Sequence, residues 1–237
     1  MKLSRLIFST HQGLGLLIGI QVFLWISGGF VMSVVPIEKV RGEDWVAERE
    51  NAPVATDLAL LAPTDIARDL EMPALEAADL TMWMDQPVYR LRAGEMVRLV
   101  AAVSGQELSP LKADTAAEVA RRDYAGPGPV AEVVLLTEPL LEIRGRDLPI
   151  WRVDFDDSRH TTIYVSPQTG QVVGRRNTIW RVYDFFWMLH IMDYSARDNF
   201  NNPLVVTCAV IAWFLATSGI WLVVVWLKRK SWRKKTA

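Results

Sequence analysis

The sequence predicts a membrane-anchored α+β protein, with a transmembrane helix near each end of the chain and a strand-rich domain between them. Three observations predict this fold: two long uncharged apolar runs, the confinement of all acidic residues to the segment between the runs, and a repeated helix-and-strand pattern in that segment. Hydrophobic residues make up 51% of the 237 residues, which excludes an intrinsically disordered chain. The single cysteine, Cys208, excludes an internal disulfide and a cysteine-based zinc site.

The two apolar runs, Gly13–Val35 and Leu204–Leu227, contain no charged residue. About 20 residues cross the core of a bilayer as a helix, and helices of soluble proteins rarely continue so far without a charged face. We therefore expect transmembrane helices over residues 12–35 and 203–227. The first is expected to be an uncleaved anchor, because it is too long for a signal peptide and Met32–Pro36 lacks a small-x-small cleavage site.

The distribution of charge indicates which parts face the cytoplasm. All 27 acidic residues and 18 of the 26 Lys and Arg lie between the two runs, which gives this segment a net charge of −9, whereas residues 1–11 and 228–237 carry only basic groups. Short basic flanks stay in the cytoplasm, while a long domain crosses regardless of its charge. Both termini are therefore expected on the cytoplasmic side of a bacterial inner membrane, with residues 36–177 in the periplasm. Trp226 and Trp232 are expected at the cytoplasmic interface. The basic tail favours contact with anionic membrane lipid over nucleic acid, which is not an expected partner.

The segment between the runs contains a duplicated unit. Gln86–Arg90 and Leu148–Arg152 share the pattern Pro-x-aromatic-Arg, and each precedes a strand-like run that ends in Gly-Gln, at Gly105 and at Gly170. The alternation of apolar and polar residues in Trp151–Phe155 is typical of a half-buried strand. The two copies therefore predict two similar sets of antiparallel strands.

Helices are expected before both copies, and a further strand is expected at the start of the second. The helices fall at Thr64–Leu70, which follows a proline, and at Asp114–Tyr124, and the strand falls at Ala131–Leu136. Helices packed on antiparallel sheets follow, because each sheet must cover one apolar face. A last helix, residues 178–194, is too short and too charged for a third crossing and is expected in the outer interface, followed by a loop over residues 195–202.

The order of these features resembles the PepSY-associated transmembrane proteins of bacteria. The residues that carry the resemblance run along nearly the whole chain: His11–Gly15, Trp25–Gly28, Trp151–Asp154, Tyr164–Val173, Leu189–His190, Ser218–Trp221 and Lys228–Arg229. The resemblance implies a periplasmic domain of two PepSY-like units, each a helix with antiparallel strands. Larger members of that family have at least one further helix pair, and their membrane histidines resemble haem ligands in iron-siderophore reduction.

Three histidines are candidates for chemistry. His160, at an expected hairpin tip, reads as a solvated loop residue. His11 and His190 are candidates for a site because ionisable groups in or beside spanning helices are costly to bury. Asp193 follows His190 by one turn and is placed to orient its ring. Two alternatives stay open: His11 as an interfacial residue bonded to headgroups or water, and His190 as a structural tie between the interfacial helix and the sheet domain.

His11 and His190 are also the candidate ligands of haem b, but one haem cannot join them. The anchor separates them by roughly 30 Å at a rise of 1.5 Å per residue. No cofactor is therefore expected, with haem b as the alternative, and no metal site is expected. The sequence also lacks a His-Glu metalloprotease motif, a nucleophile elbow and a phosphate loop, so the chain is not expected to be an enzyme.

Partner docking is the remaining function class. Six residues are assigned to it, three glycines that leave room for a neighbouring helix and three polar or aromatic side chains: Gly13, Gly15, Gly19, Gln21, Trp187 and Asp193. The sequence favours an accessory or assembly subunit that docks onto other integral membrane subunits, or onto a second copy, in a complex that transfers electrons or handles iron. Two alternatives stay open: a haem-bearing subunit of a ferric-siderophore reductase, and a regulator or inhibitor of a periplasmic peptidase.

Overall fold

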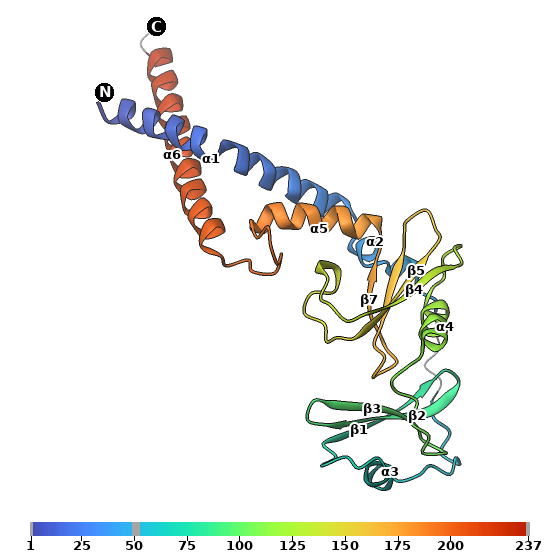
Figure 1. Cartoon of the computed structure of the whole chain (residues 1–237). Coiled ribbons are helices and arrows are strands. Elements are labelled where there is room, and N and C mark those ends of the chain that lie inside the picture. The colour runs from blue at the N-terminus through green and yellow to red at the C-terminus, as the bar shows by residue number, and fades with distance from the viewer. Residues whose placement is uncertain (1, 49–52, 236–237) are drawn as a thin grey trace. The chain divides into compact units, whose positions relative to one another are not determined.

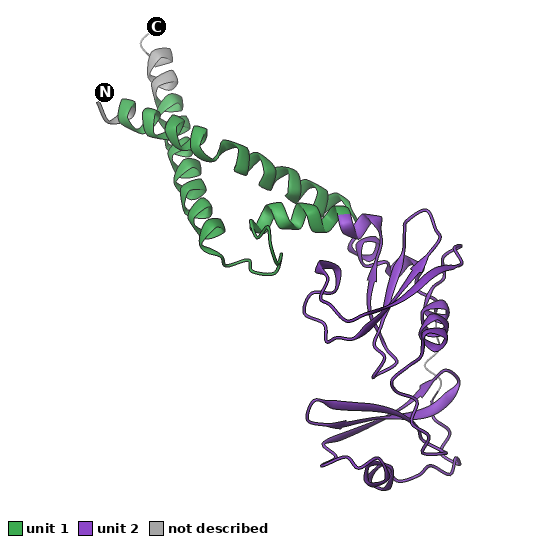
Figure 2. Cartoon of the chain, viewed as in Figure 1, with its two compact units in different colours: residues 1–36, 182–237 green, residues 37–181 purple. Residues whose placement is uncertain are grey.

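The computed structural model describes residues 2–48 and 53–235, and side chains within residues 5–48 and 53–228 (Figure 1). The side chains of Trp232 and of the basic residues after Lys228 lie outside those that the structure describes. The chain divides into two compact units (Figure 2): unit 1 consists of residues 1–36 and 182–237, and unit 2 of residues 37–181.

Unit 2 contains two antiparallel sheets, each preceded by a helix, in the same order along the chain. In its first half, α3 (Pro63–Asp69) precedes the sheet β1-β2-β3 (Ala77–Trp83, Gln86–Ala93, Met96–Ala101). In its second half, α4 (Ala113–Asp123) precedes the sheet β4-β5-β6-β7 (Val130–Leu136, Ile150–Phe155, Thr162–Val165, Val172–Arg176). Short helical segments complete the unit: α2 (Ile37–Arg41), η1 (Glu43–Trp45) and η2 (Leu141–Ile143). The predicted α+β character of this segment is confirmed.

A turn that occurs once in each half supports the duplication. The N–H of Gly105 donates to the carbonyl of Ala101 at 2.9 Å, and the N–H of Gly170 donates to the carbonyl of Ser166 at 3.0 Å. Both glycines have positive φ, 72° and 66°, a conformation that other residues adopt only with strain. The two Gly-Gln pairs noted in the sequence therefore form the same turn.

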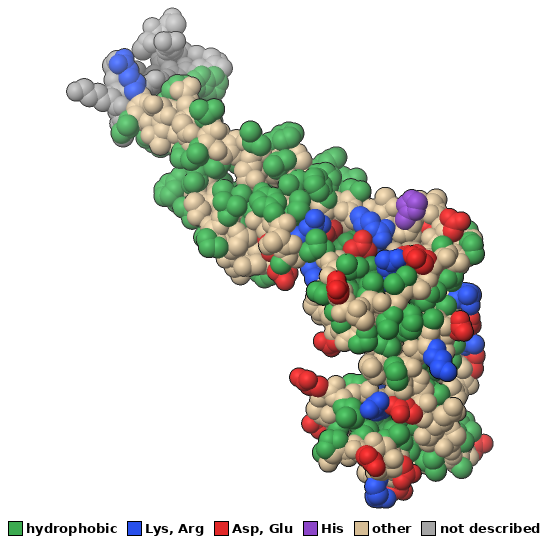
Figure 3. All heavy atoms as spheres, viewed as in Figure 1, with side chains coloured by type: hydrophobic (Ala, Val, Ile, Leu, Met, Phe, Trp, Pro, Cys, Tyr) green, Lys and Arg blue, Asp and Glu red, His purple; other side chains and the backbone are tan. Residues whose placement is uncertain are grey.

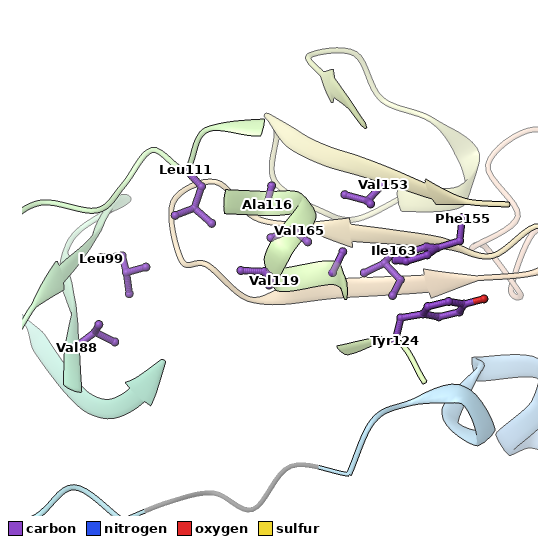
Figure 4. Packing of buried hydrophobic residues seen from close by; sticks show 11 residues of the cluster. Val88, Leu99, Leu111, Ala116, Val119, Tyr124, Val153, Phe155, Ile163 and Val165 are labelled. Carbon is purple, nitrogen blue, oxygen red and sulfur yellow. The ribbon is translucent and has the colours of Figure 1, made fainter. Parts of the chain in front are cut away.

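One hydrophobic core joins the two halves of unit 2. Figure 4 shows residues of α4 lying over the second sheet, and the same cluster includes Val88 and Leu99 of the first sheet. The halves also meet at Gly170, whose carbonyl accepts a hydrogen bond of 2.8 Å from Trp83 Nε1. A Cβ built on Gly170 would lie 2.9 Å from both Trp83 and Leu99, so a glycine is required for this close approach. Each fully buried Val or Leu of such a core contributes about 1.5–3 kcal/mol.

Unit 1 is built from α1 (Lys2–Val34), α6 (Pro203–Lys235) and most of α5 (Thr178–Ile191). Arg5–Val34 and Pro203–Lys228 are long and apolar enough to cross a membrane, and they are the two such segments among the described residues. Figure 3 shows hydrophobic side chains over these helices and most of the charged side chains over unit 2. Within unit 1, α6 packs against the first half of α1 and α5 lies against the second half.

Candidate functional site

His11 of α1 forms a hydrogen bond with α6. Its Nδ1 lies 2.8 Å from Ser218 Oγ, which also lies 2.8 Å from the carbonyl oxygen of Leu215. Which of the two atoms donates in the His11–Ser218 hydrogen bond depends on the tautomer of the ring. A Cβ built on Gly219 would lie 3.1 Å from His11 Cε1, so Gly219 gives the ring its space. The structure thus joins His11 to the Ser218-Gly219 pair, two of the motifs on which the family resemblance rests.

The C-terminal end of α5 is capped by side chains from α1 and from the loop before α6. The carbonyls of residues 189, 190 and 191 accept, in that order, from Gln21 Nε2 (3.1 Å), Trp25 Nε1 (2.7 Å) and Asn202 Nδ2 (2.9 Å). The last carbonyls of a helix have no partner within the helix, and an unpaired carbonyl in lipid costs several kcal/mol. These three donors therefore fix where α5 ends along α1.

The His190 ring, near the C-terminal end of α5, packs against Trp25 and Gly28 of α1. A Cβ built on Gly28 would lie 3.9 Å from His190 Nδ1 and 3.6 Å from the carbonyl of Phe186, which is van der Waals contact, so α5 lies directly against α1 here. The ring centroids of Trp25 and His190 are 6.4 Å apart. His190 Nδ1 is buried and has no hydrogen-bond partner among the described residues. Within unit 1 the His190 ring therefore packs on α1, through Trp25 and Gly28.

Asp193 organises the loop after α5 instead of orienting the His190 ring. Its carboxylate accepts from four backbone N–H groups between Ser195 and Asn199, each at 3.2 Å, and from Ser195 Oγ at 3.0 Å. These hydrogen bonds, with the largest effect from the Asn199 N–H, lower the pKa of Asp193 below its ordinary value. The expectation that Asp193 aligns the imidazole is corrected, because all these contacts belong to the loop.

Of the six residues assigned to docking, four make contacts inside the chain. A Cβ on Gly15 would lie 3.7 Å from Leu215, Gln21 caps α5, and Trp187 donates from Nε1 to the carbonyl of Arg197 at 3.1 Å. Asp193 holds the loop, as described above. Gly13 and Gly19, in contrast, have nothing within 4 Å of a built Cβ. The glycines left for a partner are therefore these two.

Gln12, which the sequence patterns did not single out, directly precedes Gly13 on α1. Gln12 is exposed on α1, about 10 Å along the helix from Arg5 at 1.5 Å per residue, and has no hydrogen-bond partner among the described residues. At 3.6 residues per turn it shares one face of α1 with Leu16, Gly19 and Phe23, and Leu16 and Phe23 are 90% and 67% exposed. We call these four residues the Gln12 face. The sequence signal was the seven-residue spacing of Gln12 and Gly19.

The two histidines do not fit a shared haem. His190 lies at the level of Gly28, which is 17 residues from His11 and therefore about 25 Å away along α1. One chain thus offers each haem a single histidine and no second histidine on the facing helix. Among the described residues, no group of three or more His, Cys, Asp or Glu side chains could hold a metal ion. Ligation of one haem by both His11 and His190 of the same chain therefore does not fit this geometry.

Unit 2 carries a separate cleft of about 860 Å³. It lies between the β2–β3 hairpin and two segments of the second half, residues 147–149 and 166–169, and its lining includes both arginines and acids. On the edge of β3 that faces away from β2, the Leu99 N–H donates to Ser109 Oγ and the Leu99 carbonyl accepts from the Leu108 N–H. Val97, two residues earlier, presents the same groups to the cleft, because backbone direction alternates along a strand.

The chain was compared with protein-family models, with curated proteins and with solved structures, and the first comparison supports the family resemblance. The family model of the PepSY-associated TM region matches residues 8–237, nearly the whole chain. No curated protein and no solved structure matches the chain. The matched range includes most of α1, all of the described part of α6 and all of unit 2, and it contains the His11–Ser218 and Gly28–His190 contacts. The chain belongs to the family of PepSY-associated transmembrane proteins.

Proposed function

We propose that this membrane protein is an accessory or assembly subunit that docks onto a membrane complex through the Gln12 face of α1. The observation that supports the proposal is Gln12, an exposed amide within the Arg5–Val34 span that has no hydrogen-bond partner among the residues whose side chains the structure describes. A polar side chain in hydrocarbon gains free energy by bonding to a neighbouring helix, and a glycine on the same face lets that helix approach closely. Gly19 supplies the glycine.

The proposed orientation holds unit 2 in the periplasm of a bacterial inner membrane. Contacts between His11 and Ser218 and between Gly15 and Leu215 make α1 and α6 antiparallel, so their basic ends lie together. Basic flanks of this kind favour the cytoplasmic side. Unit 2 then reaches partners outside the membrane while α1 contacts partners within it.

The partner complex is proposed to transfer electrons or to handle iron. This part of the proposal rests on the family, whose larger members have membrane histidines resembling haem ligands. Within one chain, His11 and His190 lie too far apart along α1 to ligate one haem together. We therefore favour a supporting role beside a redox subunit over a bis-histidine haem site within this chain.

The test is purification of the full chain from its native membrane in mild detergent, with identification of the subunits that travel with it. Gly19→Leu fills the Gln12 face and is expected to lose at least nine tenths of the partner. Gly13→Leu is the matched control, because Gly13 is equally open but lies about 120° around the helix from Gly19. A wild-type chain that purifies alone would contradict docking, as would equal recovery of the partner with both variants.

A second candidate, regulation of a periplasmic peptidase, is favoured by the cleft of unit 2. An extended peptide segment can add to an open strand edge through backbone hydrogen bonds, and Val97 offers such an edge. Val97→Pro removes the N–H that the segment would bond. A peptidase that co-purifies with wild type and with Gly19→Leu, but not with Val97→Pro, would establish this role; recovery of no peptidase would exclude it.

A further inference from the structure

An apolar groove lies between α1 and α6 at the end where both helices carry basic residues. It encloses about 510 Å³ and is lined by four residues of α1 from Leu6 to Leu14 and five of α6 from Ile211 to Trp221. The polar atoms of α6 in its wall are already bonded within the helix, Thr217 Oγ1 to the carbonyl of Trp213 at 3.0 Å and Ser218 Oγ to that of Leu215 at 2.8 Å. The groove therefore offers hydrocarbon surface to its occupant.

The length of the groove matches one leaflet of a bilayer. At 1.5 Å per residue, the wall on α1 is about 12 Å long and the wall on α6 about 15 Å. The hydrocarbon core of a membrane is about 30 Å thick, so one leaflet is about 15 Å deep. A transmembrane helix of a partner would need a groove along the whole span, whereas the acyl chain of one lipid needs only this depth.

The charge at the mouth of the groove selects the headgroup. Arg5 directly precedes Leu6, and Lys228 follows Trp221 by seven residues, about 10 Å along α6. Neither α1 nor α6 contains an acidic residue, so the basic groups at this end have no carboxylate on either helix. Basic side chains next to a spanning helix attract anionic lipid by about 1 kcal/mol each. The mouth therefore favours a phosphate with a net negative charge.

We propose that this groove is a binding site for one anionic phospholipid, with an acyl chain between α1 and α6 and the phosphate held by Arg5 and Lys228. The site is separate from the docking surface, because Ile7, Thr10 and Leu14 lie on the side of α1 opposite the Gln12 face. The lipid fills the space beside the His11–Ser218 contact and stabilises the packing of α1 on α6. This inference does not depend on the proposed function.

The test uses the full chain, purified in detergent and analysed by native mass spectrometry after addition of phosphatidylglycerol or phosphatidylcholine. One phosphatidylglycerol per chain is expected to remain bound, and phosphatidylcholine is not. Thr10→Trp fills the groove from an exposed position and is expected to remove the bound lipid, whereas Ser9→Trp, which is also exposed and lies at the same depth outside the groove, retains it.

A charge variant keeps the test independent of any effect of Thr10→Trp on folding. Arg5→Gln and Lys228→Gln are each expected to weaken phosphatidylglycerol binding about fivefold. Equal retention of both lipids, or unchanged binding in the charge variants, would overturn the proposal. A dimer that Thr10→Trp abolishes would also overturn it, since a second copy would then occupy the groove.

Discussion

Two adjacent glycines of α1 meet different surroundings. A Cβ built on Gly28 would lie 3.6 Å from the carbonyl of Phe186 and 3.9 Å from His190 Nδ1, whereas nothing lies within 4 Å of a Cβ on Gly29. We therefore expect Gly28→Leu to push α5 away and to lower the stability of unit 1 by about 1–3 kcal/mol. Gly29→Leu changes helix propensity by the same amount and is the control. Thermal unfolding in detergent measures both, and equal melting temperatures would contradict the packing of α5 on Gly28.

The separation of the two histidines leads to a spectroscopic prediction. Because His11 and His190 lie about 25 Å apart along α1, the purified monomer is expected to show no Soret absorption. An absorption spectrum of the detergent-solubilised chain measures this. Stoichiometric haem that disappears in His190→Ala would show instead that the chain is a haem-bearing subunit.

An ion pair between Arg175 and the buried carboxylate of Asp123 joins β7 to α4. Arg175 donates from Nε and Nη2 to the two oxygens of Asp123, both at 2.6 Å, and Asp123 is 6% exposed. Asp123→Asn leaves the guanidinium without its carboxylate and is expected to cost about 2–3 kcal/mol. Glu118→Gln, on the exposed side of α4, is expected to cost less than about 0.5 kcal/mol. Chemical unfolding of the full chain compares the two, and similar losses would refute a special role for the Asp123–Arg175 pair.

The loop between β5 and β6 gives a pH dependence. Burial opposes the charged form of Asp157, but hydrogen bonds from the Tyr124 hydroxyl (2.6 Å) and from the Arg159 and Thr161 N–H groups hold its pKa below the ordinary 3.8. A depressed carboxyl pKa stabilises the fold above the unfolded value, and this stability is lost as pH falls through the folded value. Wild type is therefore expected to exceed Asp157→Asn in stability at pH 7, with the difference shrinking below pH 3.8. A difference that grows on acidification would show the sign to be wrong.

Several elements follow from local sequence, and others depend on tertiary contacts. The helix expected at Thr64–Leu70 is α3 (Pro63–Asp69), shifted by one residue because Pro63 occupies the first turn. Asn202, directly before α6, caps that helix by accepting from the Val205 N–H at 3.0 Å, as its residue type favours. Strand β1 was not expected, because Ala77–Trp83 alternates poorly; it forms by pairing with β2 along its whole length.

At the scale of the whole molecule, charge and hydropathy predicted the membrane helices and the sheet domain, but not the candidate docking surface. Residues of α1 are apolar all round, so no periodicity indicates which face α5 and α6 cover. Gln21 was therefore assigned to a partner although it caps α5, and Gln12 was overlooked although it is exposed. Only the packing of three helices in space distinguishes these two glutamines.

The central claim is that both ends of the chain lie in the cytoplasm and that unit 2 lies outside it. Labelling of intact cells with a membrane-impermeant thiol reagent tests this most directly, in a Cys208→Ser background that removes the native thiol. A cysteine replacing Ser158, which is exposed in the loop between β5 and β6, is expected to be labelled, and one replacing Thr236 in the tail to be labelled only after lysis. The reverse pattern, a labelled tail and a protected loop, would contradict the account.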